Sequence, residues 1–317
     1  MTPVLVIFFN RSDKVARLMA RLREVKPEIL LLASDGPRPG VAGEAGKVAA
    51  IREMVDGMVN WSCTIHRFYQ EINLGCGLGP ATAITRTFEL YEEAIILEDD
   101  CVPDPSFFPY CAELLERYRD DPRVMVISGQ AFVGVPRRRE ADYFFTRYPY
   151  TWGWASWRRA WELFDLNLSD YQAILDEGWM EDVFEERQMR RVWRRRFEWV
   201  KDFRDPSVWD FQWFFACIFK GGLSVSPYEN LVDYIGFGDG ATHTNDAGRF
   251  PVCKPTGVRF PLRHPRLVVR DRLADRAIGR RYYAYNEFLF QVAAIGRRWM
   301  PRRFWAWLKR RFRFRAG

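Results

Sequence analysis

The fold of this chain is decided by residues 94–110, which read AIILEDDCVPDPSFFPY. The four apolar residues at 94–97 have the length and character of a buried β-strand. Three acids follow at once at 98–100, and a helix is expected over 105–118 with a proline in its first turn. The stretch therefore predicts a strand, an acidic loop and a helix in direct succession.

On either side of this stretch, apolar runs alternate with segments of helical periodicity. Further buried strands are expected at 4–9, 29–33, 63–69 and 124–127, and helices at 12–24, 47–58 and 80–93. Continuous apolar strands separated by helices are typical of a parallel sheet covered by helices on both faces. The sequence thus predicts an α/β fold built on a Rossmann-like, mostly parallel sheet.

Polar residues stand where three of these strands end. Asn10 and Arg11 follow the first strand, Asp35 follows the second, and the acidic triplet follows the fourth. Parallel sheets bind their ligands beyond the carboxyl ends of the strands. We therefore expect these residues to meet at one cleft.

The triplet Glu98, Asp99 and Asp100 concentrates negative charge. Adjacent carboxylates raise one another's pKa unless a positive group lies among them. Mg²⁺ or Mn²⁺ is a suitable compensator, because it binds one or two carboxylates and completes its shell with diphosphate oxygens and water. The alternative is a solvated turn whose acids favour a helix N-terminus.

With the residues that follow, the triplet resembles the signature of the N-acetylglucosaminyltransferase I family and its bacterial relatives. In that family a strand ends in Glu-Asp-Asp, and a short loop leads to Pro-Asp-Phe-Phe and a tyrosine on a helix; residues 98–110 are similar. The resemblance extends over most of residues 3–245. It implies a GT-A fold and an inverting transfer of a sugar from a nucleoside diphosphate, UDP above all, to a hydroxyl of a glycan or lipid-linked acceptor.

The resemblance also implies roles for individual residues. It assigns donor binding to Asn10, Arg11, Asp35, Glu98, Asp99, Gly153 and Trp154, and direct ligation of Mn²⁺ or Mg²⁺ to Asp100. In the family the arginine contacts the nucleotide, the aspartate after the second strand contacts uracil, and the Gly-Trp loop lies near the donor sugar. Asp210, in a Trp-Asp turn, is implied to be the catalytic base; the alternative is a helix N-cap.

The sequence shows no internal repeat and no low-complexity linker, which indicates one continuous domain with a C-terminal appendage. We expect a glycosyltransferase domain over 1–296, with a nucleotide-binding half at 1–130 and an acceptor-side half at 131–250. The Gly-rich stretch 73–80 is interpreted as a loop that lines the nucleotide cleft or as a plain turn. The stretch 236–244 is interpreted as a lid or as an ordinary loop. The charged helical stretch 180–204 has no counterpart in the family and is interpreted as a solvated face.

The net charge of +7 comes from the last residues of the chain. Residues 297–317 carry nine Lys and Arg and no acid, and residues 1–296 carry 39 basic and 41 acidic residues. A fold that binds nucleic acid should carry its basic patch on its body, so nucleic acid is not an expected partner. A basic aromatic helix suits an anionic membrane surface; the alternative is a helix docked on the body.

The sequence also bears on where the chain is located and on two alternative functions. With no apolar run long enough to span a membrane, the chain is expected in the cytoplasm, with its tail at the inner face of the plasma membrane in the first interpretation. One rival function is a nucleotidyltransferase that makes a sugar nucleotide, which would need a Gly-rich loop at the first strand. The other is a non-catalytic sugar-nucleotide-binding or membrane-scaffold protein, which would not need Asp210.

Overall fold

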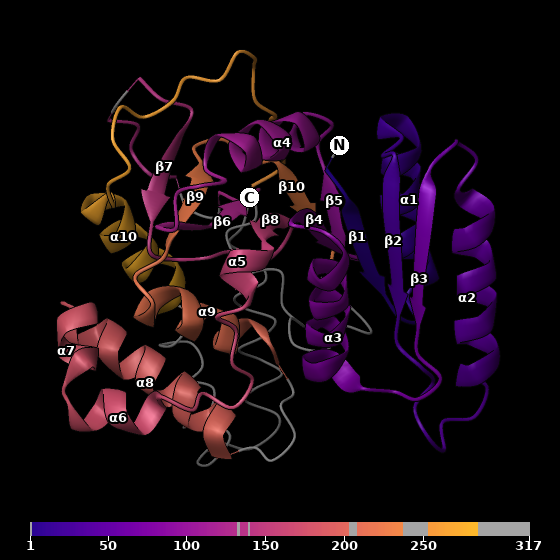
Figure 1. The fold of residues 1–317 in the computed structure, drawn as a ribbon, viewed down its shortest axis with the longest axis horizontal. Helices are drawn as coiled ribbons and strands as arrows, with labels where there is room; N and C mark the ends of the chain where they lie inside the picture. The colour runs from indigo at the N-terminus through magenta and orange to yellow at the C-terminus, as the bar shows by residue number, and fades with distance from the viewer. Residues whose placement is uncertain (1, 132–133, 139, 203–207, 237–252, 285–317) are drawn as a thin grey trace, which may run out of the picture.

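The computed structural model describes residues 2–131, 134–138, 140–202, 208–236 and 253–284 (Figure 1). Its centre is an eight-stranded sheet of order β3-β2-β1-β4-β8-β6-β9-β7. The strands are β1 (Val4–Phe8), β2 (Ile29–Ser34), β3 (Thr64–Tyr69), β4 (Glu93–Glu98), β6 (Val124–Ser128), β7 (Tyr143–Thr146), β8 (Trp154–Trp157) and β9 (Leu223–Pro227). β5 (Cys101–Pro103) and β10 (Val232–Tyr234) form a separate antiparallel pair.

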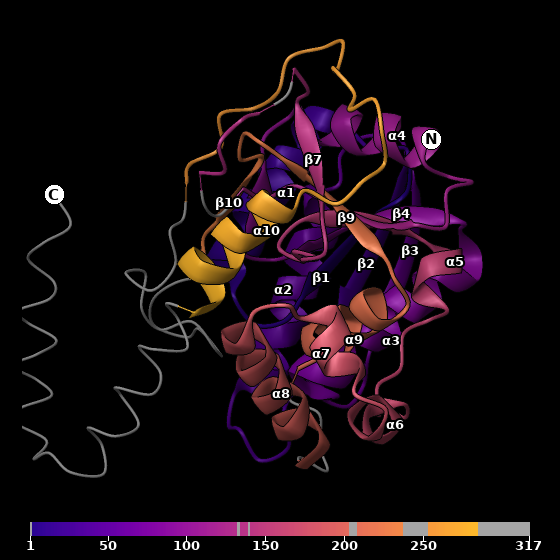
Figure 2. The same ribbon diagram turned by 90° about the vertical axis from the view of Figure 1, so that its left-hand side faces the viewer.

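The first four strands of the sheet are parallel and have helices on both faces. Val4 and Val6 of β1 share a core with α1 (Ser12–Val25) and α2 (Glu44–Met58), whereas Leu5 shares a core with α3 (Gly75–Leu90). Figures 1 and 2 show the helices on opposite sides of the sheet. The predicted α/β fold, with a mostly parallel sheet between helices, is confirmed.

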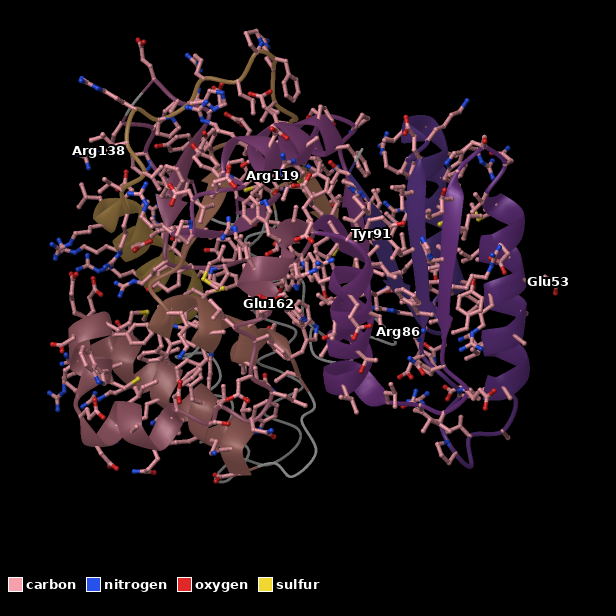
Figure 3. The ribbon with its side chains drawn as sticks, in the orientation of Figure 1. Glu53, Arg86, Tyr91, Arg119, Arg138 and Glu162 are labelled. Carbon is pink, nitrogen blue, oxygen red and sulfur yellow. The ribbon has the colours of Figure 1, made fainter. Side chains whose placement is uncertain are left out.

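Helix α3 begins earlier than the sequence predicts. The Gly-rich stretch 73–80 was expected to precede a helix starting at Pro80, but α3 starts at Gly75 and contains Pro80. The backbone N–H groups of Leu74 and Gly75 donate to Asp35 in a neighbouring loop. The stretch is therefore the start of a helix rather than a loop, and it lines the cleft described below, as one of the two interpretations expected. Further along α3, Arg86 reaches toward β3, where its guanidinium carbon lies 4.5 Å from the centre of the Phe68 ring (Figure 3).

The other half of the sheet mixes strand directions. β8 lies between β4 and β6 and is antiparallel to both, so the fourth and fifth predicted strands are not neighbours. β9 runs parallel to β6, and β7 is antiparallel to β9. α4 (Phe107–Arg117) and α5 (Arg158–Trp161) flank this half. The strands from the aromatic-rich region were not predicted, because each has only four residues and is buried throughout.

A third hydrophobic core joins further helical segments of the described chain. These are α6 (Tyr171–Asp176), α7 (Trp179–Val183), α8 (Arg187–Asp202), α9 (Asp210–Phe219), α10 (Arg272–Ile278) and the π-helix η2 (Gly279–Ala284). Residues 180–202 of the charged stretch 180–204 contain most of α7 and all of α8, and α8 buries one apolar face. The basic tail 297–317 and most of the expected loop at 236–244 lie outside the described residues.

Candidate active site

A cleft of about 850 Å³ lies beyond the carboxyl ends of β1, β2 and β4. One wall holds the strand ends with Asn10, Arg11, Asp35 and the acidic triplet. The opposite wall is aromatic and comes from residues 149–152, one face of α8, the start of α9 and part of η2. The cleft therefore brings the predicted strand-end residues together with Asp210.

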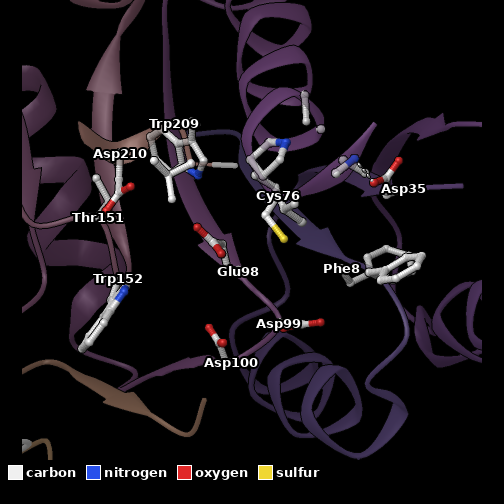
Figure 4. Close-up of a pocket in the computed structure, with 18 of the residues that line it drawn as sticks. Phe8, Asp35, Cys76, Glu98, Asp99, Asp100, Thr151, Trp152, Trp209 and Asp210 are labelled. Carbon is white, nitrogen blue, oxygen red and sulfur yellow. Dashed lines mark hydrogen bonds between the residues drawn. The ribbon is translucent and has the colours of Figure 1, made fainter. Parts of the chain in front are cut away.

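The acidic triplet sits at the floor of this cleft. Glu98 ends β4, and Asp99 and Asp100, which are 2% and 5% exposed, follow in a turn. In Figure 4 the carboxylates of Glu98 and Asp100 point into the cleft, while that of Asp99 points the other way, on the side of Phe8. Burial raises the pKa of Glu98 well above its usual value, and the charges of Asp100 and Asp99 add to this effect. Burial also raises the pKa of Asp99, against the opposing effect of Arg11.

Arg11 is the cation that compensates two of these acids. Its Nη1 donates to Oδ2 of Asp100 at 2.8 Å and its Nε donates to Oδ2 of Asp99 at 3.3 Å, with a further bond from Nη2 to Asp99. The family resemblance had implied that Arg11 contacts the nucleotide. In the structure the guanidinium of Arg11 instead donates to the two carboxylates, so fewer of its N–H groups are available to a ligand.

A metal site made of protein groups alone is not present in the described part of the chain. No three His, Cys, Asp or Glu side chains there converge as such a site requires. Mg²⁺, however, is commonly held by one or two carboxylates, with phosphate oxygens and water as its other ligands. Asp100 faces the cleft and fits this pattern (Figure 4). The expected Mn²⁺ or Mg²⁺ at Asp100 thus remains a prediction that the residues can accommodate.

Asp35 anchors the start of α3. Its Oδ1 accepts hydrogen bonds from the backbone N–H groups of Gly36 at 2.9 Å and Leu74 at 2.8 Å, and its Oδ2 accepts one from Gly75 at 2.9 Å. A Cβ on Gly36 would lie 2.4 Å from the carbonyl carbon of Ile72, so the two loops touch. The structure therefore gives Asp35 a positioning role, with less capacity left for the predicted contact to uracil.

Asn10 and Arg38 are held at the rim by one buried carboxylate. Nδ2 of Asn10 donates to Oε1 of Glu44 at 3.0 Å, and the backbone N–H of Arg38 donates to Oε2 at 2.7 Å. The side chain of Arg38 also bonds to Glu44. The hydrogen bonds from Arg38 lower the pKa of Glu44 to about 2. Glu44, at the start of α2, thus connects the loops that follow β1 and β2.

Asp210 lies on the far side of the cleft from Asp35. It is the first residue of α9 and follows the N-cap, Trp209, whose side chain makes no capping bond. Trp209 is buried and stacks on Trp154 with ring centres 5.8 Å apart. In Figure 4 the side chain of Glu98 points toward Asp210, and the charge of Asp210 contributes to the raised pKa of Glu98. The alternative that Asp210 is the N-cap is therefore not what the structure shows.

The Gly-Trp loop is placed differently from the expectation. Trp154 is fully buried in β8, and neither it nor Gly153 lines the cleft. Gly153 has φ +76°, and a Cβ there would lie 2.7 Å from Val232, so the chain can turn here only with glycine. Trp152 lines the cleft instead and stacks on Tyr234, with ring centres 3.8 Å apart. Trp154 supports Trp209 from behind rather than contacting a donor.

Several cleft residues were missed by the sequence analysis. Lys14, in the first turns of α1, is 8% exposed, and its Nζ has no hydrogen-bond partner within the part of the chain that the structure describes. Lys47 of α2 and Arg38 also line the cleft, and Arg196 lies on the aromatic wall. Lys14 could have been found from the sequence, because it lies only a few residues after the end of a predicted strand. The positions of Lys47, Arg38 and Arg196 within a helix or loop did not indicate that they line the cleft.

Comparisons with known proteins do not place the chain in a family. No family model matches it, and no curated protein sequence does. Among solved structures, it is similar to a cytidylyltransferase from Leptospira borgpetersenii, with a TM-score of 0.33, 12% identity and coverage of 52% of this chain and 63% of the other. A mannose-1-phosphate geranyltransferase from Thermus thermophilus gives 0.31 and 16%, with coverage of 56% and 63%.

A third similar structure is a UDP-glucose pyrophosphorylase complexed with UDP-glucose, with a TM-score of 0.25, 12% identity and coverage of 46% and 62%. This chain spans less than two thirds of the length of each of the three. At these TM-scores and identities the three structures do not decide between the glycosyltransferase and the nucleotidyltransferase function. Separately, none of the described helices has the length and apolar character that crossing a membrane requires.

Proposed function

We propose that this protein is an inverting glycosyltransferase that moves a sugar from a UDP-sugar to a hydroxyl of a glycan or lipid-linked acceptor. The observation that carries the proposal is the position of Asp210. This carboxylate stands across the cleft from Asp35, beside an acidic strand end, on a wall built from residues that follow the nucleotide-binding half. A base on one wall and a nucleotide site on the other is the arrangement that such a transfer needs.

The nucleotide end of the cleft suits an anion between apolar walls. Phe8 and Phe68 line it together with Lys14, Arg38 and Lys47. A buried ammonium without a partner is costly, and buried polar groups in folded proteins are nearly always hydrogen-bonded. An oxygen of a bound diphosphate would satisfy Nζ of Lys14. This supports a nucleoside diphosphate as the ligand.

Asp100 would hold Mn²⁺ or Mg²⁺, which when bound supplies charge neutralisation for the leaving diphosphate. Hydrogen bonds from Arg11 hold the carboxylates of Asp100 and Asp99 in place. Glu98 lies between these acids and Asp210, where it can bond to a sugar hydroxyl. The ring of Trp152 lines the cleft and is held flat against Tyr234, so it adds an aromatic surface to the acceptor-side wall.

Asp210 would take the proton of the acceptor hydroxyl. A hydroxyl is a poor nucleophile until its proton is removed in the transition state, and a positioned base is worth roughly 10²–10⁴-fold in rate. Attack from this wall comes from the side opposite the nucleotide end, which inverts the configuration at the sugar. A fold that only bound sugar nucleotides would have no need of a carboxylate here.

The loop between β1 and α1 supports a nucleotidyltransferase less well than a glycosyltransferase. Between β1 and α1 there are three residues, Phe9, Asn10 and Arg11, and no glycine. Cradling a triphosphate by backbone N–H groups needs a close approach that glycine permits. The arginine of this loop is moreover committed to Asp99 and Asp100.

One assay separates the two chemistries. The protein is incubated with Mn²⁺ and either a panel of UDP-sugars with glycan acceptors, or nucleoside triphosphates with sugar 1-phosphates. We expect UDP release in the first mixture and no pyrophosphate in the second. Asp210→Asn should keep its melting temperature and UDP affinity while turnover falls roughly 10²–10⁴-fold. Asp182→Asn, at an exposed position of α7, is the matched control. Pyrophosphate release, or normal turnover in Asp210→Asn, would refute the proposal.

A further inference from the structure

Helix α8 carries a dense set of arginines, and one of them differs from the others. Arg187, Arg191, Arg194 and Arg195 are exposed, and none of them lines the cleft. Arg196 is partly buried and does line it, together with Trp193 and Trp199, three residues before and after it. Residues three apart share a face of a helix. The face of α8 that meets the cleft is therefore Trp-Arg-Trp.

Aromatic rings hold Arg196 in place. Its guanidinium carbon lies 4.8 Å from the ring centre of Trp193, 5.2 Å from that of Phe211 and 5.1 Å from that of Tyr283. These rings come from three elements, α8, α9 and η2, so the guanidinium is fixed at their junction. Rings that lie against a guanidinium leave its N–H edge for hydrogen bonds and reduce the entropy lost on binding.

Among the described residues, no acid forms an ion pair with Arg196, although its neighbour on the helix, Arg194, pairs with Glu198. A charge that is partly buried in a binding cleft and has no counter-ion is suited to an anion supplied by a ligand. The donor diphosphate is not that anion, since its end of the cleft lies on the opposite wall.

Arg196 stands close to the proposed base. Phe211, which contacts the guanidinium, is the residue after Asp210. The charges of Arg196 and Asp210 both act on Tyr282 and Tyr283, so the four side chains share one wall. A group held by Arg196 would thus belong to the molecule whose hydroxyl lies at Asp210.

We propose that Arg196 binds a phosphate or carboxylate group of the acceptor, so that the substrate that receives the sugar is an anionic sugar or sugar phosphate. The inference rests on the proposed glycosyl transfer, because it takes Asp210 as the residue that marks the acceptor side. Guanidinium edges match both oxyanions with paired hydrogen bonds. The two sources of that chemistry, a phosphoryl group and a uronate, are separated by the choice of probe.

The test measures binding as well as turnover. Glucose, glucuronate and glucose 6-phosphate are titrated into the protein with saturating UDP and Mn²⁺, and dissociation constants are obtained by ligand-observed NMR. Wild-type protein should bind at least one anionic probe about 10- to 100-fold more tightly than glucose, the usual worth of a hydrogen-bonded charge. The tighter of the two anions identifies the oxyanion class.

Variants then locate the effect. Arg196→Gln should remove the preference for the anionic probe and leave glucose binding and UDP affinity unchanged. Arg191→Gln removes the same charge from an exposed position of α8 and should change nothing. Arg196→Lys keeps the charge but not the planar fork, so an intermediate loss is expected even if the glutamine variant is less stable.

Two results would overturn the inference: equal binding of neutral and anionic probes by wild-type protein, or equal losses in Arg196→Gln and Arg191→Gln. Failure of the proposed function has a different signature. In that case no UDP-sugar is turned over with any acceptor, while the anion preference and its dependence on Arg196 persist.

Discussion

Replacing Arg11 by methionine should lower the stability of the protein, because it removes the cation that pairs with the acids after β4. Arg11 is the only cation that pairs with Asp99 and Asp100 in the described structure, and both carboxylates are almost fully buried. Methionine keeps much of the packing volume and removes the charge. The variant therefore leaves two buried carboxylates without compensation.

The expected loss of stability follows from that geometry. Removing one partner of a buried ion pair typically costs 3–5 kcal/mol, because the remaining charge is left in a poorly polarisable site. The side chain of Arg11 is 23% exposed, so water at the cleft can partly replace it and the low end of that range applies. We expect the free energy of unfolding to fall by about 3 kcal/mol, a large share of the 5–15 kcal/mol typical of a domain.

Urea denaturation in EDTA measures this loss. Arg17→Met, in the helix that follows Arg11, is the control, because Arg17 is 58% exposed and its Nη2 lies 3.8 Å from Oδ2 of Asp233. Such exposed pairs contribute less than about 1 kcal/mol. Saturating Mn²⁺ and UDP should return part of the lost stability to Arg11→Met, since a cation at Asp100 compensates the same acids. If Arg11 instead served only to contact the nucleotide, its variant would unfold like Arg17→Met and lose UDP affinity alone. That result would refute the assignment.

Three further changes test the rest of the cleft. Lys14→Met should weaken UDP binding in calorimetry by about 10-fold or more without loss of stability, since it removes a buried ammonium that has no hydrogen-bond partner among the described residues. Asp100→Asn should make the UDP dissociation constant the same in Mn²⁺ and in EDTA, while wild-type protein binds more tightly with the metal. Glu44→Gln should unfold more readily than wild-type protein at pH 7. Because the pKa of Glu44 is lowered to about 2 in the folded state, this difference should persist above the unfolded pKa and close as the pH falls from about 5 to 2, as followed by thermal melting.

The parallel half of the sheet could be predicted because its signals are local. Each strand is a short apolar run that ends in a polar residue, and the carboxyl ends of parallel strands meet at one edge. That rule alone places Asn10, Asp35 and Glu98 in the same cleft. It does not say where a long side chain points, so the ion pairs of Arg11 with the acids beside Glu98 could not be foreseen. Nor does the rule predict that the carboxylate of Asp35 accepts hydrogen bonds from backbone N–H groups at the start of α3.

The aromatic region shows a different limit. Residues 148–157 contain Tyr148, Tyr150, Trp152, Trp154 and Trp157 in near alternation, so hydropathy cannot tell a ring in the core from a ring in the cleft. The turn at Gly153, with its positive φ, changes the direction of the chain between Trp152 and Trp154. One ring therefore faces the cleft, and the other is sealed between sheet and α9. Only the tertiary packing distinguishes them.

Helix α8 was interpreted as a solvated face because its arginines dominate its composition. Its apolar residues nevertheless recur at the helical period, at Met189, Val192, Trp193, Phe197 and Val200, and these are the buried ones. That stripe predicts a helix packed on one side. Arg196 lies at the border of the stripe, between two tryptophans at helical spacing. The stem of an arginine in such a position packs against the body of the protein beside its apolar neighbours. Its guanidinium then lies at the cleft that the helix borders. Nothing in the composition of α8 sets Arg196 apart from the other arginines, but the fold places it on the same wall of the cleft as Asp210.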